Sequence, residues 1–208
     1  KRSDLLTERE GLKIILEEAK AAQIKQLGYI SSLVMKYQGM NHFNWWVFDV
    51  KQQAVEQIKK SGIPSLIFYP SNFMDNFHHV YRKGNKILLA GESKHKMYFI
   101  ASVDFAKQVV TAFENYEMQT KDFIIQGLEG FTADEAAKIF VDHYTKEKLV
   151  ISKAPLGLLK LLGVFVQPLN YGSHIIEALN NYPEKFEAEE TWKALGKPQI
   201  TLEQFARF

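Results

Sequence analysis

The chain has 208 residues, of which 46% are hydrophobic and 24% charged, and its formal net charge is +2. This composition is typical of a globular protein with a sizeable core, and it excludes a disordered chain. The 26 basic and 24 acidic residues are mixed along the sequence, so no nucleic-acid partner is expected. Cysteine is absent, which excludes disulfides, zinc–thiolate sites and thiol nucleophiles and favours a reducing, cytoplasmic setting.

The first part of the chain alternates predicted helices and strands. Thr7 and Glu10 are spaced as a capping box, and a helical apolar period then runs to about residue 23. Buried strands are predicted over residues 25–31 and 63–70, and a helix between them covers residues 47–58. Strands that are apolar throughout and alternate with helices indicate a parallel sheet covered on both faces, which is an α/β fold.

The second part predicts weaker strands, near residues 86–90, 97–101, 122–127 and 148–152. A helix over residues 103–115 is expected to be capped by Ser102 and to bury the apolar face formed by Ala106, Val109, Val110 and Phe113. Two further capping boxes predict helices that begin near Thr132 and Thr201.

The longest apolar run, residues 156–166, is too short to span a membrane. It predicts a buried or amphipathic helix, and a membrane-surface element is the alternative. No membrane partner is expected.

A lysine interrupts the apolar face of the helix predicted over residues 47–58. Positions 47, 51, 54, 55 and 58 share that face, and position 51 is Lys51. Such a lysine commonly extends its ammonium group to solvent, which requires no function. The alternative is that Lys51 faces a ligand.

Several motifs occur in a recognisable order. Ser31-Ser32 ends the first strand, the Lys51 helix follows, and the run KSGIPSLIFYPSNFMDN covers residues 60–76. Farther along are FIASVDFA at residues 99–106 and QGLEGFT at residues 126–132. This order resembles the NmrA-like branch of the atypical short-chain dehydrogenase/reductase family.

The resemblance implies part of an NAD(P)-binding Rossmann fold. Residues 1–127 would form the second half of the dinucleotide-binding domain, and residues 128–208 a mostly helical substrate or lid region packed on it. The glycine-rich turn that receives the cofactor pyrophosphate in this family does not occur in the 208 residues. At roughly 30 residues per crossover unit, about 90 residues would be expected before Lys1, and the strand at residues 25–31 would otherwise have an open apolar edge.

The family also implies a cofactor site at the carboxyl ends of the strands. The implied cofactor-binding residues are Ser31, Ser32, Lys51, Pro70, Ser71, Asn72 and Phe73. Lys51 is the candidate catalytic residue, because the family uses this lysine to hold the nicotinamide ribose and to activate a tyrosine four residues earlier. Here that position is Val47, so the usual proton donor is absent.

Three residues, Tyr37, His42 and Tyr69, are candidates for a displaced proton donor. Two simpler roles remain open for the other implied site residues. The hydroxyls of Ser31 and Ser32 could satisfy backbone groups of their turn, and Asn72 could cap the short helix that follows.

An aromatic cluster, the histidines and a Gly-Ser-His run give weaker indications of function. The aromatic cluster Phe43, Trp45, Trp46 and Phe48 could line a flat substrate pocket, or could belong to the core or to an oligomer interface. The histidines have no metal-ligand spacing, so no metal is expected. Gly172-Ser173-His174 lacks the glycines of a nucleophile elbow, which disfavours a serine hydrolase.

The sequence therefore predicts an NmrA-like protein that binds NAD or NADP, with NADP favoured. One hypothesis is a reductase of a small, flat quinone-like or carbonyl substrate. The alternative is a non-catalytic cofactor sensor, or a protein-interaction module that has lost the cofactor. The sequence leaves a homodimer open.

Overall fold

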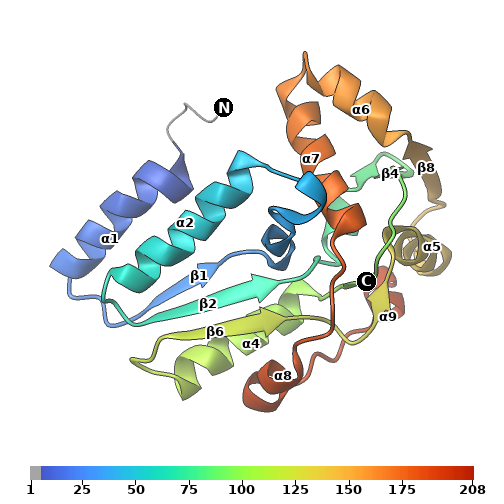
Figure 1. Cartoon of the computed structure of the whole chain (residues 1–208). Coiled ribbons are helices and arrows are strands. Elements are labelled where there is room, and N and C mark those ends of the chain that lie inside the picture. Colours follow the sequence, from blue (N-terminus) through green and yellow to red (C-terminus); the bar gives the residue numbers. More distant parts are fainter. Residues whose placement is uncertain (1–5) are drawn as a thin grey trace.

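The computed structural model describes residues 6–208, and a three-stranded parallel sheet lies at its centre (Figure 1). Helices cover both faces of this sheet, so the predicted α/β fold is confirmed. One face carries two helices, α1 (Leu12–Ala21), which follows the short segment η1 (Thr7–Gly11), and α2 (Trp46–Lys60), and the other carries α4 (Ser102–Asn115). The strand order is β1 (Leu27–Ile30), β2 (Ser65–Pro70) and β6 (Lys121–Ile125).

The two predicted buried strands differ in burial. All six residues of β2 are buried, as predicted. β1 pairs with β2 alone within the described part of the chain, and Ile30 is 53% exposed. Phe113 of α4 lies so close to Gly28 that a Cβ at Gly28 would be 2.8 Å from the Phe113 ring. The prediction of a buried strand is therefore wrong for the α4-facing side of β1.

Helix α4 buries a different face from the one predicted. Val110 and Phe113 are 57% and 37% exposed, whereas Asp104 and Gln108 are each 2% exposed. The reason is the C-terminal segment that packs on α4. The Asp104 carboxylate accepts hydrogen bonds from the backbone N–H groups of residues 199 and 200, and the Gln108 amide donates to the carbonyl of residue 196. The buried face of α4 therefore combines these two polar side chains with the apolar Phe105 and Ala112.

Smaller sheets extend the fold beyond the carboxyl ends of the central strands. β4 (Lys86–Ala90) and β8 (Val150–Ala154) are parallel neighbours, and two-residue pairings involve β3 (Arg82–Lys83), β5 (Met97–Tyr98) and β7 (Gly130–Phe131). The strand at 86–90 is confirmed, while the one expected at 97–101 is shorter. Since β4 and β8 lie on either side of residue 127, they join the two predicted regions, and the division at that residue stays a prediction.

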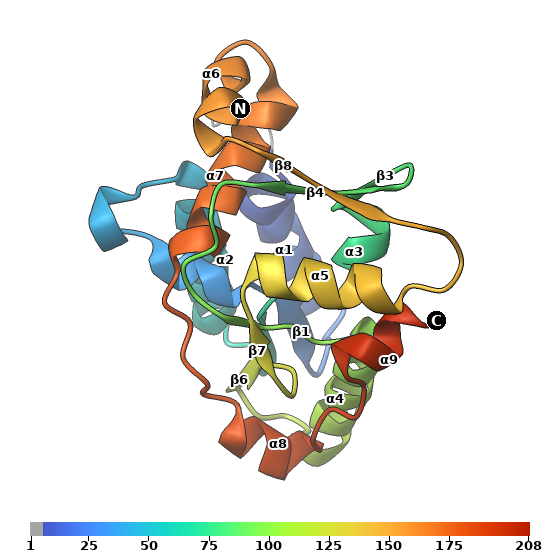
Figure 2. The same cartoon turned by 90° about the vertical axis from the view of Figure 1, so that its right-hand side faces the viewer.

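Helices gather at the carboxyl end of the central sheet, the side that faces the viewer in Figure 2. They are the short η2 (Leu33–Tyr37), η3 (Met40–His42) and α3 (Asn76–His79), and the C-terminal α5 (Ala133–His143), α6 (Leu156–Gly163), α7 (Gln167–Asn181) and α9 (Leu202–Ala206). Helix α8 (Glu189–Leu195) instead packs against α4 and the edge strand β6. The apolar run 156–166 forms α6 and its turn to α7. It was predicted to be a buried or amphipathic helix, yet only Gly163 in α6 is buried and Phe165 beyond it is 85% exposed.

Two of the four helix caps predicted from the sequence are formed. The capping boxes at Thr132 and Thr201 are both formed. Ser102 does not cap α4. Its N–H and hydroxyl both donate to the Asp75 carboxylate, at 2.9 and 2.6 Å. At the N-terminus the Glu10 carboxylate accepts from the N–H of Leu6, so Thr7 lies inside the first turn and the predicted box is not formed.

Candidate functional site

A cavity of about 560 Å³ opens where the carboxyl ends of β1 and β2 meet α7. Six of the seven predicted cofactor-binding residues line it, namely Ser31, Ser32, Pro70, Ser71, Asn72 and Phe73. They come together because parallel strands end at one edge of a sheet, and the turn after each strand places its polar groups there. The opposite walls are mostly apolar and come from β4, α6 and α7, with Leu88, Leu159 and Ile176 among their residues. The cavity therefore has one polar edge and apolar walls.

A buried carboxylate closes one end of the polar edge. Glu184 lines the cavity and accepts hydrogen bonds from the Ser71 hydroxyl at 2.8 Å and the Gln126 amide at 2.7 Å. Burial raises the pKa of Glu184, although these hydrogen bonds act in the opposite direction. The Ser71 hydroxyl also accepts from the N–H of Tyr98 at 3.2 Å. Ser71 is thus already bonded as donor and as acceptor.

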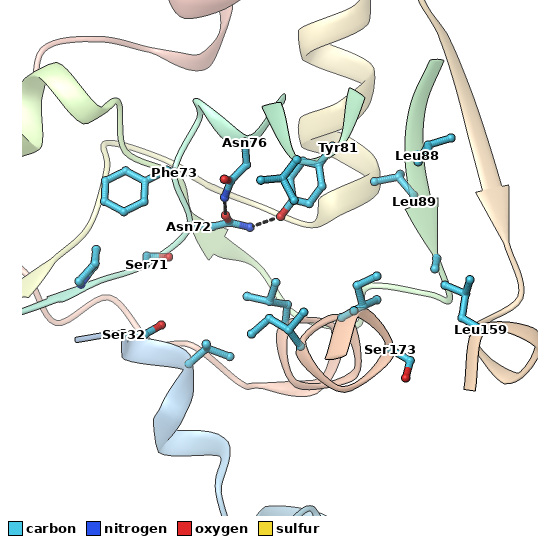
Figure 3. Close-up of a pocket in the computed structure, with 18 of the residues that line it drawn as sticks. Ser32, Ser71, Asn72, Phe73, Asn76, Tyr81, Leu88, Leu89, Leu159 and Ser173 are labelled. Atoms are coloured by element: carbon cyan, nitrogen blue, oxygen red, sulfur yellow. Dashed lines mark hydrogen bonds between the residues drawn. The ribbon is translucent and has the colours of Figure 1, made fainter. Parts of the chain in front are cut away.

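A second group of side chains, which we call the Tyr81 network, consists of Asn72, Asn76 and Tyr81 (Figure 3). The Asn76 amide donates to Asn72 Oδ1 at 2.7 Å, and Asn72 Nδ2 donates to the Tyr81 hydroxyl at 2.6 Å. Asn72 is 6% exposed, and burial raises the pKa of Tyr81. The phenol of Tyr81 is therefore neutral at physiological pH and lines the cavity.

Lys51, the seventh predicted residue, does not line the cavity. Its ammonium group forms an ion pair with Glu8 Oε1 at 2.8 Å, and the hydroxyl of Tyr29 donates to the same oxygen at 2.7 Å. Burial, followed by the neighbouring Glu8 carboxylate, raises the pKa of Tyr29. We call Glu8, Tyr29 and Lys51 the Lys51 network. Lys51 thus has a structural partner, and its role toward a cofactor stays a prediction.

The three candidates for a displaced donor also lie away from the cavity wall. Tyr37 is 3% exposed and its hydroxyl accepts a long 3.4 Å contact from Asn41. Tyr69 donates to Asp122 at 3.2 Å, and burial followed by the Asp122 charge raises its pKa. His42 is exposed at the end of η3.

The aromatic cluster belongs to the core rather than to the cavity. Phe43, Trp45 and Phe48 are buried between η2, α2 and the sheet. Trp45 also stacks on His174 of α7, with ring centroids 5.6 Å apart. These contacts fix α7 against the sheet and so form the support behind one cavity wall.

Sequence reasoning missed Tyr81 and Glu184. The signal for Tyr81 is present in the sequence, because Asn72, Asn76 and Tyr81 follow one another closely after β2. The signal for Glu184 is weak, because a contact between residues 71 and 184 depends on the path of the chain after α7.

Within the described chain, no group of three or more acidic or histidine side chains is arranged to hold a metal ion. No helix of residues 6–208 has the length and apolar character needed to cross a membrane.

A parallel sheet with helices on both faces and a polar cavity at its carboxyl edge defines a Rossmann-type α/β protein. The sequence model of the NmrA-like family matches residues 7–204. Because the match covers nearly the whole chain, this protein belongs to the NmrA-like family. A search of curated protein sequences finds no match.

Several solved structures share the fold. An NADPH-dependent quinone oxidoreductase from Escherichia coli is 15% identical with a TM-score of 0.70, and the alignment covers 94% of this chain and 71% of that one. A nucleoside-diphosphate-sugar epimerase from Staphylococcus aureus is 16% identical with a TM-score of 0.71, covering 95% and 70%. A Citrobacter triphenylmethane reductase bound to NADP(H) is 14% identical with a TM-score of 0.68, covering 93% and 68%. At these identities the likeness establishes the fold alone.

Proposed function

We propose that this protein is an NAD(P)H-dependent reductase that takes a flat, largely apolar quinone-like or carbonyl compound in the cavity described above. The observation that carries the proposal is the cavity itself, with one polar edge at the ends of β1 and β2 and apolar walls. A planar ring system fits apolar walls, and its carbonyl oxygen needs a hydrogen-bond donor once it is removed from water.

The cofactor proposal rests on the polar edge and on family membership. Ser31, Ser32 and the turn at residues 70–73 provide hydroxyl, amide and backbone groups that suit the nicotinamide end of a dinucleotide. The 208 residues contain no glycine-rich turn for the pyrophosphate, so they fit only that end. When bound, the cofactor would supply hydride. We propose NADP over NAD. Two solved structures of the same fold support this choice, the NADPH-dependent quinone oxidoreductase and the triphenylmethane reductase complexed with NADP(H).

Lys51 has a defined place in this proposal. It would hold the nicotinamide ribose, as the family pattern implies, but its ammonium group would first have to exchange its bond to Glu8 for bonds to the ribose hydroxyls. The donor that protonates the substrate would come from the cavity wall, because position 47 is valine.

The reductase proposal is tested by NADPH oxidation with a panel of quinones, measured on the full-length protein. We expect turnover that depends on the quinone, together with a thermal shift on NADPH binding. Tight NADPH binding without turnover would refute the reductase and support a sensor. Absence of any thermal shift with NADPH or NADH would refute the cofactor site.

A sensor or interaction module is the second candidate. Val47 at the tyrosine position and the Lys51–Glu8 ion pair favour it, because both reduce the catalytic equipment known for the family. This candidate predicts unchanged quinone concentrations during incubation with NADPH. The homodimer stays a prediction for both candidates, and analytical ultracentrifugation can test it.

A further inference from the structure

Several hydroxyl groups line the cavity, and they differ in whether they already donate a hydrogen bond to another group of the protein. Ser31 donates to Met35 Sδ at 3.3 Å, Ser71 donates to Glu184, and Ser173 donates to the carbonyl of residue 170 at 2.9 Å. These three hydroxyls have partners inside the protein. A ligand that needs a donor would have to break one of these bonds first.

Tyr81 is different because of the direction of its hydrogen bond. Asn72 Nδ2 donates to the Tyr81 oxygen, so the phenol accepts and its own hydrogen is not used in that bond. The direction is fixed by Asn72. Its Nδ2 also faces Met97 Sδ at 3.8 Å, and a thioether sulfur can only accept, while its Oδ1 accepts from Asn76. A flipped amide would turn its oxygen toward that sulfur and lose this contact.

The tyrosine ring is also held in place. Its centroid lies 5.2 Å from that of Phe77 in an edge-to-face contact, and Phe77 is fully buried. The backbone on either side is bonded as well, with the Tyr81 N–H donating to the carbonyl of residue 76 and its carbonyl accepting from residue 88. Orientation by such contacts lowers the entropy that a side chain loses when it binds a ligand.

Two other hydroxyls in the wall, those of Ser32 and Ser152, neither donate nor accept a hydrogen bond within the described residues. Both are short, partly exposed side chains whose hydroxyls can rotate. Neither is held by a second side chain as Tyr81 is. Tyr81 is thus the hydroxyl of the cavity that combines an unused hydrogen with a fixed direction.

We propose that Tyr81 is the specificity-determining residue of the cavity, and that its hydroxyl donates a hydrogen bond to a carbonyl oxygen of a flat, apolar ligand. Asn72 and Asn76 are positioning residues, because they act only through Tyr81. This inference rests on the proposed function for its ligand class, but it concerns binding alone and does not require a bound cofactor.

The raised pKa of Tyr81 supports the assignment, since a phenol that stays protonated remains a donor over a wide pH range. An anionic ligand oxygen would also accept from it, yet the mostly apolar walls and the Glu184 carboxylate, which lines the same cavity, disfavour an anionic ligand. A neutral carbonyl or quinone oxygen therefore fits the site best.

The experiment compares 2-methyl-1,4-naphthoquinone with 2-methylnaphthalene, which lacks both carbonyl oxygens, on the full-length protein without any nucleotide. Dissociation constants are measured by calorimetry for the unmodified protein, for Tyr81→Phe and for Tyr37→Phe. Tyr37→Phe is the matched control, because it removes a buried hydroxyl outside the cavity. We expect Tyr81→Phe to weaken quinone binding about tenfold and to leave the hydrocarbon unchanged, whereas Tyr37→Phe changes neither.

A second variant, Asn72→Asp, tests the direction of the bond. An aspartate accepts the Tyr81 hydrogen, so quinone binding should fall about as much as in Tyr81→Phe although the hydroxyl is still present. Circular dichroism and thermal melts establish that each variant is folded before binding is measured. If Asn72→Asp is not folded, Tyr81→Phe alone decides.

Unchanged quinone affinity in Tyr81→Phe would overturn the inference, as would an equal loss for both compounds, which would indicate a change of cavity shape. The reductase proposal fails by a different result. If the quinone preference depends on Tyr81 but NADPH is not oxidised, the recognition stands and the reductase is refuted.

Discussion

Two hydrogen-bond networks in this protein each combine a tyrosine with two polar side chains, and they use the tyrosine in opposite ways. In the Lys51 network, Tyr29 donates its hydrogen to Glu8, and the carboxylate also binds the lysine. In the Tyr81 network, the Tyr81 hydroxyl accepts a hydrogen bond from Asn72 and does not donate its own hydrogen in that bond. The first network joins η1, β1 and α2, and each of its three groups has a partner within the network. The second lines the cavity and has a donor left for a ligand.

This difference shows why a motif residue and a ligand-binding residue need not coincide. Lys51 occupies the family position and is engaged with Glu8, while Tyr81 occupies no motif and faces the cavity. Three substitutions test this difference, from the largest expected effect to the smallest. Asn72→Leu breaks the Tyr81 network, Lys51→Met breaks the Lys51 network, and Glu184→Gln changes the buried carboxylate at the polar edge of the cavity.

The largest effect is expected from Asn72→Leu, which removes the centre of the Tyr81 network. Asn72 is buried, and its loss leaves the Asn76 amide without its acceptor and the Tyr81 oxygen without its donor. We expect the free energy of unfolding to fall by roughly 2–3 kcal/mol in urea titrations. Asn115→Leu is the control, because Asn115 is exposed and has a 3.4 Å contact to a carbonyl. A loss of stability no larger than that of the control would contradict the network.

A smaller effect is expected from Lys51→Met. The ion pair with Glu8 is partly exposed, so its removal should lower the free energy of unfolding by no more than about 1 kcal/mol. If Lys51 also holds the cofactor ribose, NADPH affinity should fall about tenfold while affinity for 2-methyl-1,4-naphthoquinone stays the same. Lys60→Met, which breaks an exposed pair with Glu56 on the same helix, is the control. NADPH binding that matches this control would remove Lys51 from the cofactor site.

The smallest effect is a pH dependence at Glu184. Burial raises the pKa of Glu184 in the folded state, so ionising this side chain costs more free energy in the folded protein than in the unfolded chain. Stability from this group is therefore highest at low pH and decreases as pH rises from the ordinary glutamate pKa through the raised one. We expect Glu184→Gln to be more stable than the unmodified protein at pH 8 and equal to it near pH 4, as measured by urea titrations. An equal difference at both pH values would contradict the raised pKa.

Much of the fold could be predicted from the sequence. The period of the apolar residues identified α2 and β2, and the capping boxes at Thr132 and Thr201 marked two helix starts. The carboxyl-edge residues were also found, because a parallel sheet gathers its strand ends at one edge. These features depend on neighbouring residues in the chain, which a sequence displays directly.

The errors share one physical cause, which is packing by distant segments. Two polar residues of α4, Asp104 and Gln108, are buried by a chain segment near residue 200. At the start of that helix, Ser102 donates to the distant Asp75 carboxylate instead of capping the helix. Glu184 meets Ser71 across more than a hundred residues. The partner of Lys51 is likewise far away in the sequence. Periodicity cannot identify such partners, so the sequence found the edge of the cavity but not the donor within it.

The central claim is that the Tyr81 network, and not the Lys51 network, contacts the quinone. The most direct measurement is a crystal structure of the full-length protein with 2-methyl-1,4-naphthoquinone bound. The account predicts the quinone in the cavity, with one of its oxygens about 2.5–3.0 Å from the Tyr81 hydroxyl oxygen. A quinone bound outside the cavity, or one whose oxygen is held by the Lys51 ammonium group, would contradict the account.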